Sequence, residues 1–167
     1  MQADSAALQN QPQTSPPTLR RANNADRDAI VQLHSEGHEL VGVSHDPNLD
    51  SDLEDVEGTY LSRGGEFLVI TEDDRVIGMG GFRKLDSRHV ELRRLRVARE
   101  AQRRGLGRCL LRRLVEEGAT RGFKSMVLDA SAEMTEARAL FSSEGFELER
   151  EGEFFGLEVF FYRRSLA

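Results

Sequence analysis

The chain has 167 residues, of which 38% are hydrophobic, and its 23 lysines and arginines against 29 aspartates and glutamates give a net charge of −6. This length suits one domain with a buried core. No stretch approaches the ~18 to 20 consecutive apolar residues of a membrane span, and no signal-peptide pattern opens the chain, so we expect a soluble cytoplasmic protein without a membrane partner. A single cysteine, Cys109, excludes an internal disulfide and a cysteine-based zinc site.

Residues 1–18 hold three of the four prolines and a single charged residue, Asp4. Such a segment buries too little apolar surface to order itself, so we expect a disordered tail before a single domain over 19–167. The domain is expected to open with a strand at Leu19–Ala22 and a helix that Asn24 caps. The apolar side of that helix is Ala29, Ile30 and Leu33.

A second helix is predicted from apolar residues that recur at intervals typical of one helical face. These residues are Leu49, Leu53, Val56 and Tyr60. Either Asn48 or Asp50 is positioned to cap this helix, and Gly64 and Gly65 are expected to end it.

A β-hairpin is predicted next, with strands at Phe67–Ile70 and Val76–Phe82 and an acidic turn at Glu72–Asp74. A further strand follows at His89–Val97. Because the loop between the first two strands is short, we expect these two strands to pair antiparallel.

The apolar side of the strand His89–Val97 changes parity along its length. Val90 and Leu92 alternate onto one face, whereas Leu95 and Val97 belong to the other. A β-bulge inserts one residue and has this effect, and an imperfect amphipathic strand is the alternative. A bulge would also free backbone amides to bind a ligand or a developing oxyanion.

A helix is expected from Gly107 to Arg121, with Gly122 placed to stop it and Phe123 packed back over its end. Its apolar stripe is Leu106, Leu110, Leu111 and Leu114. The remaining expected elements are a strand at Met126–Leu128, a helix over Met134, Ala137, Leu140 and Phe141 that Gly145 ends, and strands at Phe146–Leu148 and Val159–Arg163. This alternation predicts an α/β domain of the α+β type with a mixed sheet.

The loop Gln102–Gly107 lies between a strand and a helix, and its sequence is Gln-Arg-Arg-Gly-Leu-Gly. Its two glycines let the backbone approach a ligand, and the helix start leaves about four amide hydrogens without intrahelical partners. With Arg103, Arg104 and Arg108 nearby, these amides suit a pyrophosphate. An ordinary glycine turn before a solvated arginine-rich helix is the alternative. The third glycine of the dinucleotide fingerprint and the Gly-Lys-Ser/Thr ending of the Walker loop are both absent.

Three segments together resemble the GNAT superfamily of acyl-CoA-dependent N-acyltransferases: Glu91–Val97, the loop Gln102–Gly107, and Met134–Phe141 with the Glu-Gly-Phe that follows at 144–146. The loop is similar to the family's pyrophosphate-binding signature, Gln/Arg-x-x-Gly-x-Gly/Ala. The resemblance implies a mixed central sheet with a splayed strand pair flanked by helices. It also implies an N-acetyltransferase that moves an acetyl group from acetyl-CoA to a primary amine by direct attack in a ternary complex, without a metal.

The same resemblance implies where acetyl-CoA binds. Its pyrophosphate would lie on the amides of the loop, and its pantetheine arm would follow the end of the strand before the loop. The implied cofactor-binding residues are Leu95, Arg96, Val97, Gln102, Arg103, Arg104, Gly105, Leu106, Gly107, Arg108, Met134 and Phe141.

An amine acceptor with a pKa of about 10.4 is almost entirely cationic at neutral pH, so a base must help. Glu91 stands eleven residues before Gln102, the spacing of a catalytic glutamate in some GNAT members, and the resemblance makes it the candidate base. Without the resemblance, Glu91 is an exposed strand charge paired with an arginine. The oxyanion would lie against an amide near Leu95 or Val97.

This sequence departs from the family at two positions. Relatives often have a tyrosine as the general acid where Phe141 stands, and many have an asparagine where Met134 stands. Tyr162 or water is then expected to protonate the thiolate. A thiol with a pKa of about 8.5 already forms a tolerable leaving group.

Two other groups invite different chemistry. Cys109 suggests a covalent acyl-enzyme, although a small packed residue is the simpler interpretation. His34, His38 and His45 suggest a metal site, but no carboxylate motif accompanies them and Gly37 weakens the helix, so we expect them to line or flank the acceptor side.

Charge is divided unevenly along the chain. The segment 93–121 carries ten arginines and three glutamates, a local charge of +7, which leaves −13 on the remainder. The basic segment suits an anionic cofactor and the acidic remainder suits a cationic acceptor such as a polyamine, an amino-sugar or a lysine peptide, unless both are simply solvated surface.

Two alternative functions stay open, namely a catalytically silent acyl-CoA-binding sensor of the same fold and a nucleic-acid-binding module that uses the arginine-rich helix. The acidity of the whole chain disfavours nucleic acid, and five of the eleven aromatics gather near the C-terminus instead of alternating with the arginines. We expect this aromatic cluster to form core or a homodimer surface. Its members are Phe154, Phe155, Phe160, Phe161 and Tyr162.

Overall fold

A computed structural model of the protein describes residues 15–40 and 48–167. Its centre is a seven-stranded mixed sheet in the order β1-β2-β3-β4-β5-β7-β6. The strands are β1 (Thr18–Arg21), β2 (Glu66–Glu72), β3 (Arg75–Lys84), β4 (His89–Val97), β5 (Ser125–Ser131), β6 (Glu147–Phe154) and β7 (Leu157–Ser165). The helices are α1 (Arg27–Leu40), α2 (Val56–Thr59), α3 (Leu106–Thr120) and α4 (Thr135–Ser143), with 3-10 turns η1 (Asn24–Asp26), η2 (Ser51–Glu54), η3 (Leu61–Arg63) and η4 (Arg99–Ala101).

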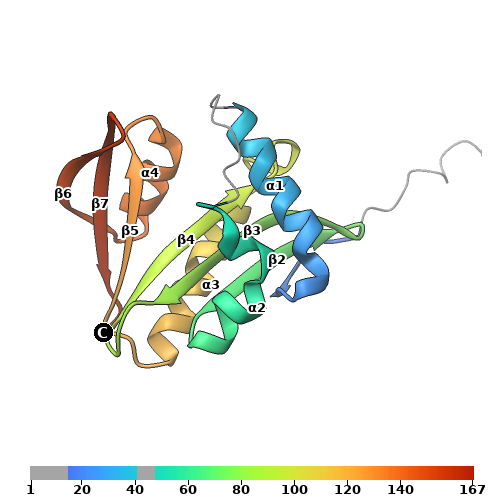
Figure 1. The fold of residues 1–167 in the computed structure, drawn as a ribbon, viewed down its shortest axis with the longest axis horizontal. Coiled ribbons are helices and arrows are strands. Elements are labelled where there is room, and N and C mark those ends of the chain that lie inside the picture. Colours follow the sequence, from blue (N-terminus) through green and yellow to red (C-terminus); the bar gives the residue numbers. More distant parts are fainter. Residues whose placement is uncertain (1–14, 41–47) are drawn as a thin grey trace, which may run out of the picture.

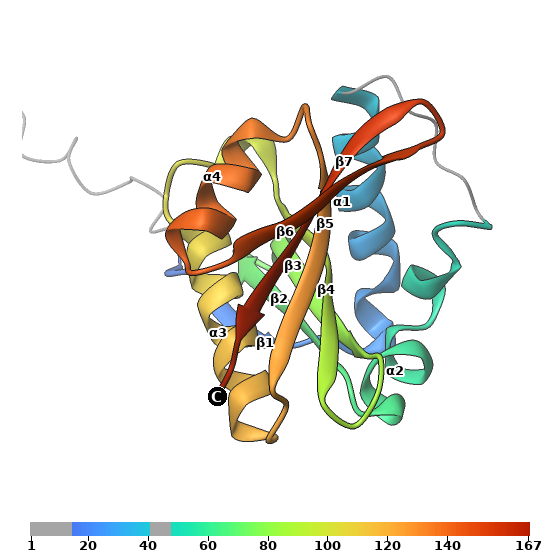
Figure 2. The same ribbon diagram turned by 90° about the vertical axis from the view of Figure 1, so that its left-hand side faces the viewer.

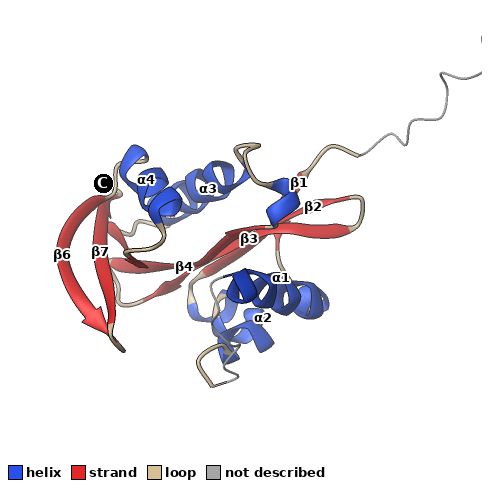
Figure 3. Ribbon diagram, turned by 90° about the horizontal axis from the view of Figure 1, so that it is seen from above, coloured by secondary structure: helices blue, strands red, loops and turns tan. Residues whose placement is uncertain are grey.

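The helices cover both faces of the sheet. Seen from above, α3 and α4 lie on one face and α1 and α2 on the other (Figure 3). The predicted α/β fold with a mixed sheet and flanking helices is therefore confirmed.

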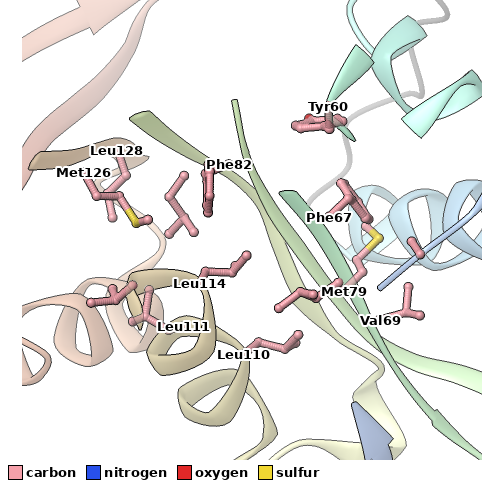
Figure 4. Packing of buried hydrophobic residues seen from close by; sticks show 14 of the residues in the cluster. Tyr60, Phe67, Val69, Met79, Phe82, Leu110, Leu111, Leu114, Met126 and Leu128 are labelled. Carbon is pink, nitrogen blue, oxygen red and sulfur yellow. The ribbon is translucent and has the colours of Figure 1, made fainter. Parts of the chain in front are cut away.

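The main core lies between α3 and the sheet. Leu110, Leu111 and Leu114 are fully buried, and Figure 4 shows them pointing from α3 toward the strands. Two glycines of β3 allow this close packing, because a Cβ at Gly78 would lie 3.2 Å from Leu110 and one at Gly80 would lie 3.3 Å from Leu114. The predicted leucine stripe thus faces the sheet.

β4 and β5 separate after a short pairing. They run parallel and pair only through His89–Glu91 and 125–127. Beyond that point β4 continues beside β3 and β5 continues beside β7, so the two strands diverge like the arms of a V (Figure 1). The outer end of the sheet, past β5, is the β6–β7 hairpin (Figure 2). The splayed strand pair is therefore present.

β4 contains the predicted bulge. Gly81 of β3 pairs with Arg93 and Met79 pairs with Arg96, so β4 has one more residue than β3 over this interval. Arg94, inside the interval, has a φ of +62°, which L-residues other than glycine rarely adopt. The change of apolar parity in the sequence marks this insertion.

The second predicted helix is wrong in its continuity. The segment forms η2, α2 and η3 in succession, and Leu49 is 62% exposed instead of lying on the buried face with Leu53. Asp50 makes no side-chain cap, and the capping carboxylate is Asp55, which accepts a hydrogen bond from the amide of Gly58. Asp50 is instead drawn into an ion pair with Arg94.

Several elements begin, end or are capped one or a few residues away from the predicted positions. Asn23, not Asn24, caps η1, through a capping box with Asp26. Of the segment expected as a tail, residues 15–18 are described: the Ser15 amide donates to Asp73 at 2.9 Å and β1 begins at Thr18, while 1–14 lie outside the described residues. The acidic turn between β2 and β3 is confirmed, with positive φ at Asp73 and Asp74.

The C-terminal aromatics do not form one cluster, which corrects the prediction. Alternation along β7 buries Phe160 and Tyr162, whereas Arg150 lies 3.6 Å over the ring of Phe161. Phe154 and Phe155 stand at the hairpin tip and are 61% and 85% exposed. Part of the set is therefore core and part is surface.

Candidate functional site

The start of α3 presents unsatisfied backbone amides. Gly105 is the N-cap residue with a φ of +78°, and no side chain caps the helix. The first-turn amides therefore have neither intrahelical nor side-chain acceptors. Because the helix is 15 residues long, its dipole adds positive potential at this end. The predicted loop residues Gln102–Gly107 form the approach to this helix end.

The arginines around the loop each face a carboxylate. Arg103 lies 3.5 Å from Glu136 of α4, and Arg104 bonds Glu72 of β2. Glu144 accepts hydrogen bonds from Arg112 and Arg108, which hold its pKa below the ordinary value. The basic side chains are therefore already compensated, so the amides are the part of the loop that is ready for an anion.

The end of β4 also offers an amide toward the gap between β4 and β5. Ala98 donates its amide to Ile77 of β3 at 2.8 Å. Because strand amides alternate in direction, the amide of Val97 points to the opposite edge, where pairing with β5 has ended. The side chain of Gln102 donates to the Val97 carbonyl at 3.2 Å and ties the loop to the strand.

A buried ionic cluster holds the bulge. Arg94 donates to Asp52 at 2.6 and 3.1 Å, to Asp50 at 3.0 Å and to the carbonyl of Leu49 at 3.1 Å. Tyr60 donates to the same Asp52 at 2.5 Å. We call Arg94, Asp50, Asp52 and Tyr60 the bulge clamp, since it secures a left-handed residue in a strand by side-chain bonds to η2 and α2.

The bulge clamp holds one cation, Arg94, and two carboxylates, Asp50 and Asp52. Burial of Asp52 opposes its ionisation, but hydrogen bonds from Arg94 and Tyr60 outweigh burial and hold the pKa of Asp52 below its ordinary value. Burial and the neighbouring Asp52 raise the pKa of the Tyr60 hydroxyl. His34, 2% exposed, lies 3.1 Å from Asp50 through its Nε2. Asp52 is therefore ionised at neutral pH and bonded to the Arg94 guanidinium, whereas Tyr60 stays neutral.

Glu91 lies where β4 and β5 begin to separate. It bonds Arg83 at 3.2 Å and lies 3.4 Å from the Nε of Arg93, and its side chain is 20% exposed. Across the gap, Asp129 of β5 has its pKa raised by desolvation and by the negative charge of Glu91. The pairing of Glu91 with arginines, which the sequence left as an alternative role, is present together with a second carboxylate.

Glu91 and Tyr162 lie on opposite faces of the sheet. A Cβ on Gly118 of α3 would lie 3.9 Å from Val90, so Val90 faces α3 and Glu91 faces α1 and α2. Tyr162 packs against Phe141 of α4, with ring centroids 6.4 Å apart, on the α3 side. The structure does not bring the two expected catalytic side chains together.

The expected α4 residues differ in exposure. Phe141 is buried, and the Tyr162 hydroxyl accepts a hydrogen bond from Nε of Arg138 at 3.0 Å. Met134 is the N-cap residue of α4, is 43% exposed, and makes no side-chain cap bond. An asparagine at this position would supply the cap that Met134 lacks.

The remaining candidates are dispersed. Cys109 is exposed, which corrects the expectation of a packed residue. The side chain of His38 and all of His45 lie outside the described residues. Over the parts that the structure describes, no cluster of three or more histidine, cysteine or acidic side chains could hold a metal, and no helix is long and apolar enough to cross a membrane.

The sequence predicted neither the ion pairs of the bulge clamp nor a role for Asp129. Asp50 was expected only as a helix cap, and Tyr60 only as part of an apolar helical face. Arg94, the partner of Asp50, is 44 residues away in the sequence, so local periodicity carries no signal of the pair. The sequence did contain one signal for the clamp. Arg94 stands where the apolar parity of the strand changes, and a bulge at that point changes the direction of its side chain.

Comparison with known proteins gives one consistent match. Residues 27–146 match the model of the acetyltransferase (GNAT) family. Human N-acetyltransferase 8 is 31% identical over 108 residues, which is 61% of this chain and 48% of the relative, so the chain spans about half the length of that relative.

Two solved structures share the fold. A GNAT-family acetyltransferase from Staphylococcus aureus Mu50 superposes with a TM-score of 0.84 at 19% identity, over 91% of this chain and all of the other. The protein yncA from Salmonella typhimurium, solved with its cofactor acetyl-CoA, has a TM-score of 0.74 at 27% identity, over 90% of this chain and 94% of the other.

Proposed function

The chain belongs to the acetyltransferase (GNAT) family, and on this premise we propose that it transfers an acetyl group from acetyl-CoA to a primary amine by direct attack in a ternary complex. The observation that carries the proposal is the uncapped start of α3 beside the splayed end of β4. The free amides at the start of α3 suit the anionic diphosphate of acetyl-CoA, and those at the end of β4 suit its pantetheine arm, which itself contains amide groups.

The chain's own residues hold the donor in the following way. The amides of Arg103–Arg108 bind the diphosphate, with Gly105 and Gly107 leaving the backbone open to it. The amides at Leu95 and Val97 bind the pantetheine arm and the oxygen on which negative charge develops. When bound, acetyl-CoA supplies the acetyl group and a thiolate leaving group.

Glu91 accepts the proton of the attacking amine, directly or through a water, on the face of α1 and α2. Tyr162 or a water returns a proton to the departing sulfur on the face of α3 and α4. In the balance, a C–N bond forms and the C–S bond breaks. The ammonium nitrogen loses two protons through Glu91 to solvent, sulfur gains one from Tyr162 or a water that solvent reprotonates, and one proton is released overall. Placement of Glu91 and Tyr162 on opposite faces supports this division, because amine and thiolate then use opposite sides of the sheet.

The loop contact is tested with two variants of Gly107. A Cβ at Gly107 would meet Leu140 and Val97 at 3.7 Å, so Gly107→Ala fits without a clash. The larger Gly107→Phe should fill the space beside the amides and weaken acetyl-CoA binding in a calorimetric titration, while Gly107→Ala retains it. Equal affinity of both variants for acetyl-CoA, with both folded, would contradict the loop contact.

The base is tested with Glu91→Gln. Turnover should fall by roughly 10²- to 10⁴-fold, most visibly below neutral pH, with little change in acetyl-CoA affinity. Thiol release from acetyl-CoA with a panel of amines measures the rate. An unchanged rate across that pH range would remove Glu91 from the base role.

A second function, acyl-CoA binding without turnover, draws support from Phe141, which replaces a hydroxyl with a buried ring. Saturable binding of acetyl-CoA without thiol release, across amines, amino acids and a lysine peptide, would favour that sensor. Thiol release that depends on an amine would favour the enzyme.

A further inference from the structure

Arg96 is a partly buried cation that has no partner among the residues that the structure describes. Its guanidinium makes no hydrogen bond and no ion pair with any residue of the described chain, although Arg94, two positions earlier, makes four hydrogen bonds. Arg83 and Arg93 share the carboxylate of Glu91. Among the arginines of this strand region, Arg96 is thus left over on the acceptor side of the sheet.

The environment of Arg96 disfavours its charge. Burial and the positive charge of Arg94 lower the pKa of Arg96, and the negative charge of Asp50 offsets them only in part. A desolvated cation without a hydrogen-bond acceptor is costly in a folded protein, and an incoming anion relieves that cost. Arginine presents a planar fork of donors that matches a carboxylate.

The position of Arg96 is fixed by the bulge and by a glycine. Arg96 pairs with Met79 beyond the bulge, so its side chain points to the α1 and α2 face, as does that of Glu91. A Cβ on Gly37 of α1 would lie 0.9 Å from Nη1 of Arg96, so the guanidinium occupies the notch that Gly37 leaves. Arg96 also directly follows Leu95, whose amide is proposed to face the reacting carbonyl.

We propose that Arg96 binds the carboxylate of the acceptor, which makes the acceptor an amino acid. The inference rests on the proposed acetyl transfer and names its substrate class. The carboxylate takes no part in the bond changes; it anchors the amine beside the acyl group.

The charge pattern of this face supports a zwitterion. Near the start of the splay, Arg83 and Arg93 share the charge of Glu91. Asp129 is therefore the carboxylate that attracts an ammonium group, whereas Arg96 farther along β4 attracts a carboxylate. A polyamine or an amino-sugar would meet an uncompensated cation at Arg96. The proposed acceptor is therefore bipolar, whereas the acidic remainder of the chain by itself favoured a cationic one.

The experiment compares amino acids with their own amides as acceptors in the thiol-release assay. The panel contains glycine, alanine, leucine, glutamate, lysine, β-alanine and γ-aminobutyrate, each beside its amide, with spermidine as a cationic amine. In the parent protein, at least one acid should exceed its amide in kcat/KM by roughly tenfold or more. The spacing of amine and carboxylate in the best acid measures the distance from Arg96 to the acyl group.

Three variants locate the preference at Arg96. Arg96→Met keeps the aliphatic stem and should lower the acid-to-amide ratio by roughly 10- to 100-fold, with no loss of stability, because it removes an unpaired cation. Gly37→Ala keeps the charge but displaces the guanidinium and should lower the same ratio. Arg99→Met, at an exposed arginine just past the strand, is the matched control and should leave the ratio unchanged.

A binding measurement separates specificity from rate. Calorimetric titration of the CoA-saturated protein with the best acid and its amide should show tighter binding of the acid, and Arg96→Met should abolish the difference. Amides or spermidine acetylated as well as the acids, or a loss in Arg96→Met that is equal for acid and amide, would overturn the assignment while acetyl transfer stands. Failure to bind acetyl-CoA and to release thiol with every amine would refute the proposed function, and this inference with it.

Discussion

The bulge of β4 and the loop before α3 serve the same proposed ligand, but they are built in opposite ways. The bulge is secured from the side by the bulge clamp, whose members Arg94, Asp50 and Asp52 are nearly excluded from solvent. The loop is exposed, and its arginines meet their carboxylates at the surface, with Arg103 87% and Glu136 84% exposed.

The backbone of the bulge depends on side-chain contacts, whereas the backbone of the loop does not. Glycine adopts the left-handed conformation of Gly105 without strain, and helix geometry alone frees the amides there. At the bulge, Arg94 holds an unfavourable conformation, so only strong tertiary bonds can keep it. We therefore expect that removal of a side chain destabilises the protein strongly at the bulge and only slightly at the loop.

The largest effect is expected from Asp52→Ala. Removal of this carboxylate takes two hydrogen bonds from the buried Arg94 and the acceptor from the Tyr60 hydroxyl, which together cost about 3 to 5 kcal/mol of unfolding free energy. Denaturant unfolding measures the loss, and Glu136→Ala, which removes an exposed carboxylate at the loop, is the matched control with an unchanged midpoint. Equal midpoints for Asp52→Ala and the parent would show that the clamp does not stabilise the bulge.

A smaller effect is expected from Arg94→Lys, which keeps the charge but loses the planar fork. Lysine cannot reach Asp50, Asp52 and the Leu49 carbonyl together. We therefore expect the unfolding free energy to fall by about 1 to 3 kcal/mol, which corresponds to the loss of one or two charge-assisted hydrogen bonds. The acetyl-transfer rate should fall further than acetyl-CoA affinity, because the bulge positions the Leu95 amide while the loop still holds the diphosphate. A fall in affinity with an unchanged rate at saturation would contradict this division.

The bulge clamp should also make the stability of the protein depend on pH in acid, through Asp52. Burial aside, bonds from Arg94 and Tyr60 lower the pKa of Asp52, so the folded state binds fewer protons than the unfolded state near and below pH 4. The stabilisation is complete above the unfolded pKa of about 3.9 and is lost as the pH falls through the lowered folded value. Asp52→Asn should unfold with a flatter pH profile in acid than the parent, and parallel profiles would contradict the assignment.

The smallest effect is expected from Arg104→Met at the loop. Its bond to Glu72 is at the surface, where ion pairs add little to stability, and the midpoint of unfolding should not move. Acetyl-CoA affinity should fall by less than about tenfold, since the amides remain and only a nearby charge is lost. A loss as large as that of Gly107→Phe would show that the side chain, not the backbone, carries the contact.

Local pattern was enough to predict the order of most elements in this protein. The parity change between Leu92 and Leu95 predicted the bulge, and the two glycines of Gln102–Gly107 predicted the uncapped helix start. Gly122 and Gly145 ended their helices as expected, with φ of +85° each. Such features depend on neighbours within a few residues, which the sequence displays directly.

Tertiary structure alone decided which charges met. The helix expected around Leu53 broke into short turns because Asp50 and Asp52 bond an arginine more than 40 residues away. The same contacts left Arg96 unpaired among the described residues, and strand alternation put Glu91 and Tyr162 on opposite faces. Periodicity reports which face a residue prefers, but the partner on that face depends on how distant segments pack.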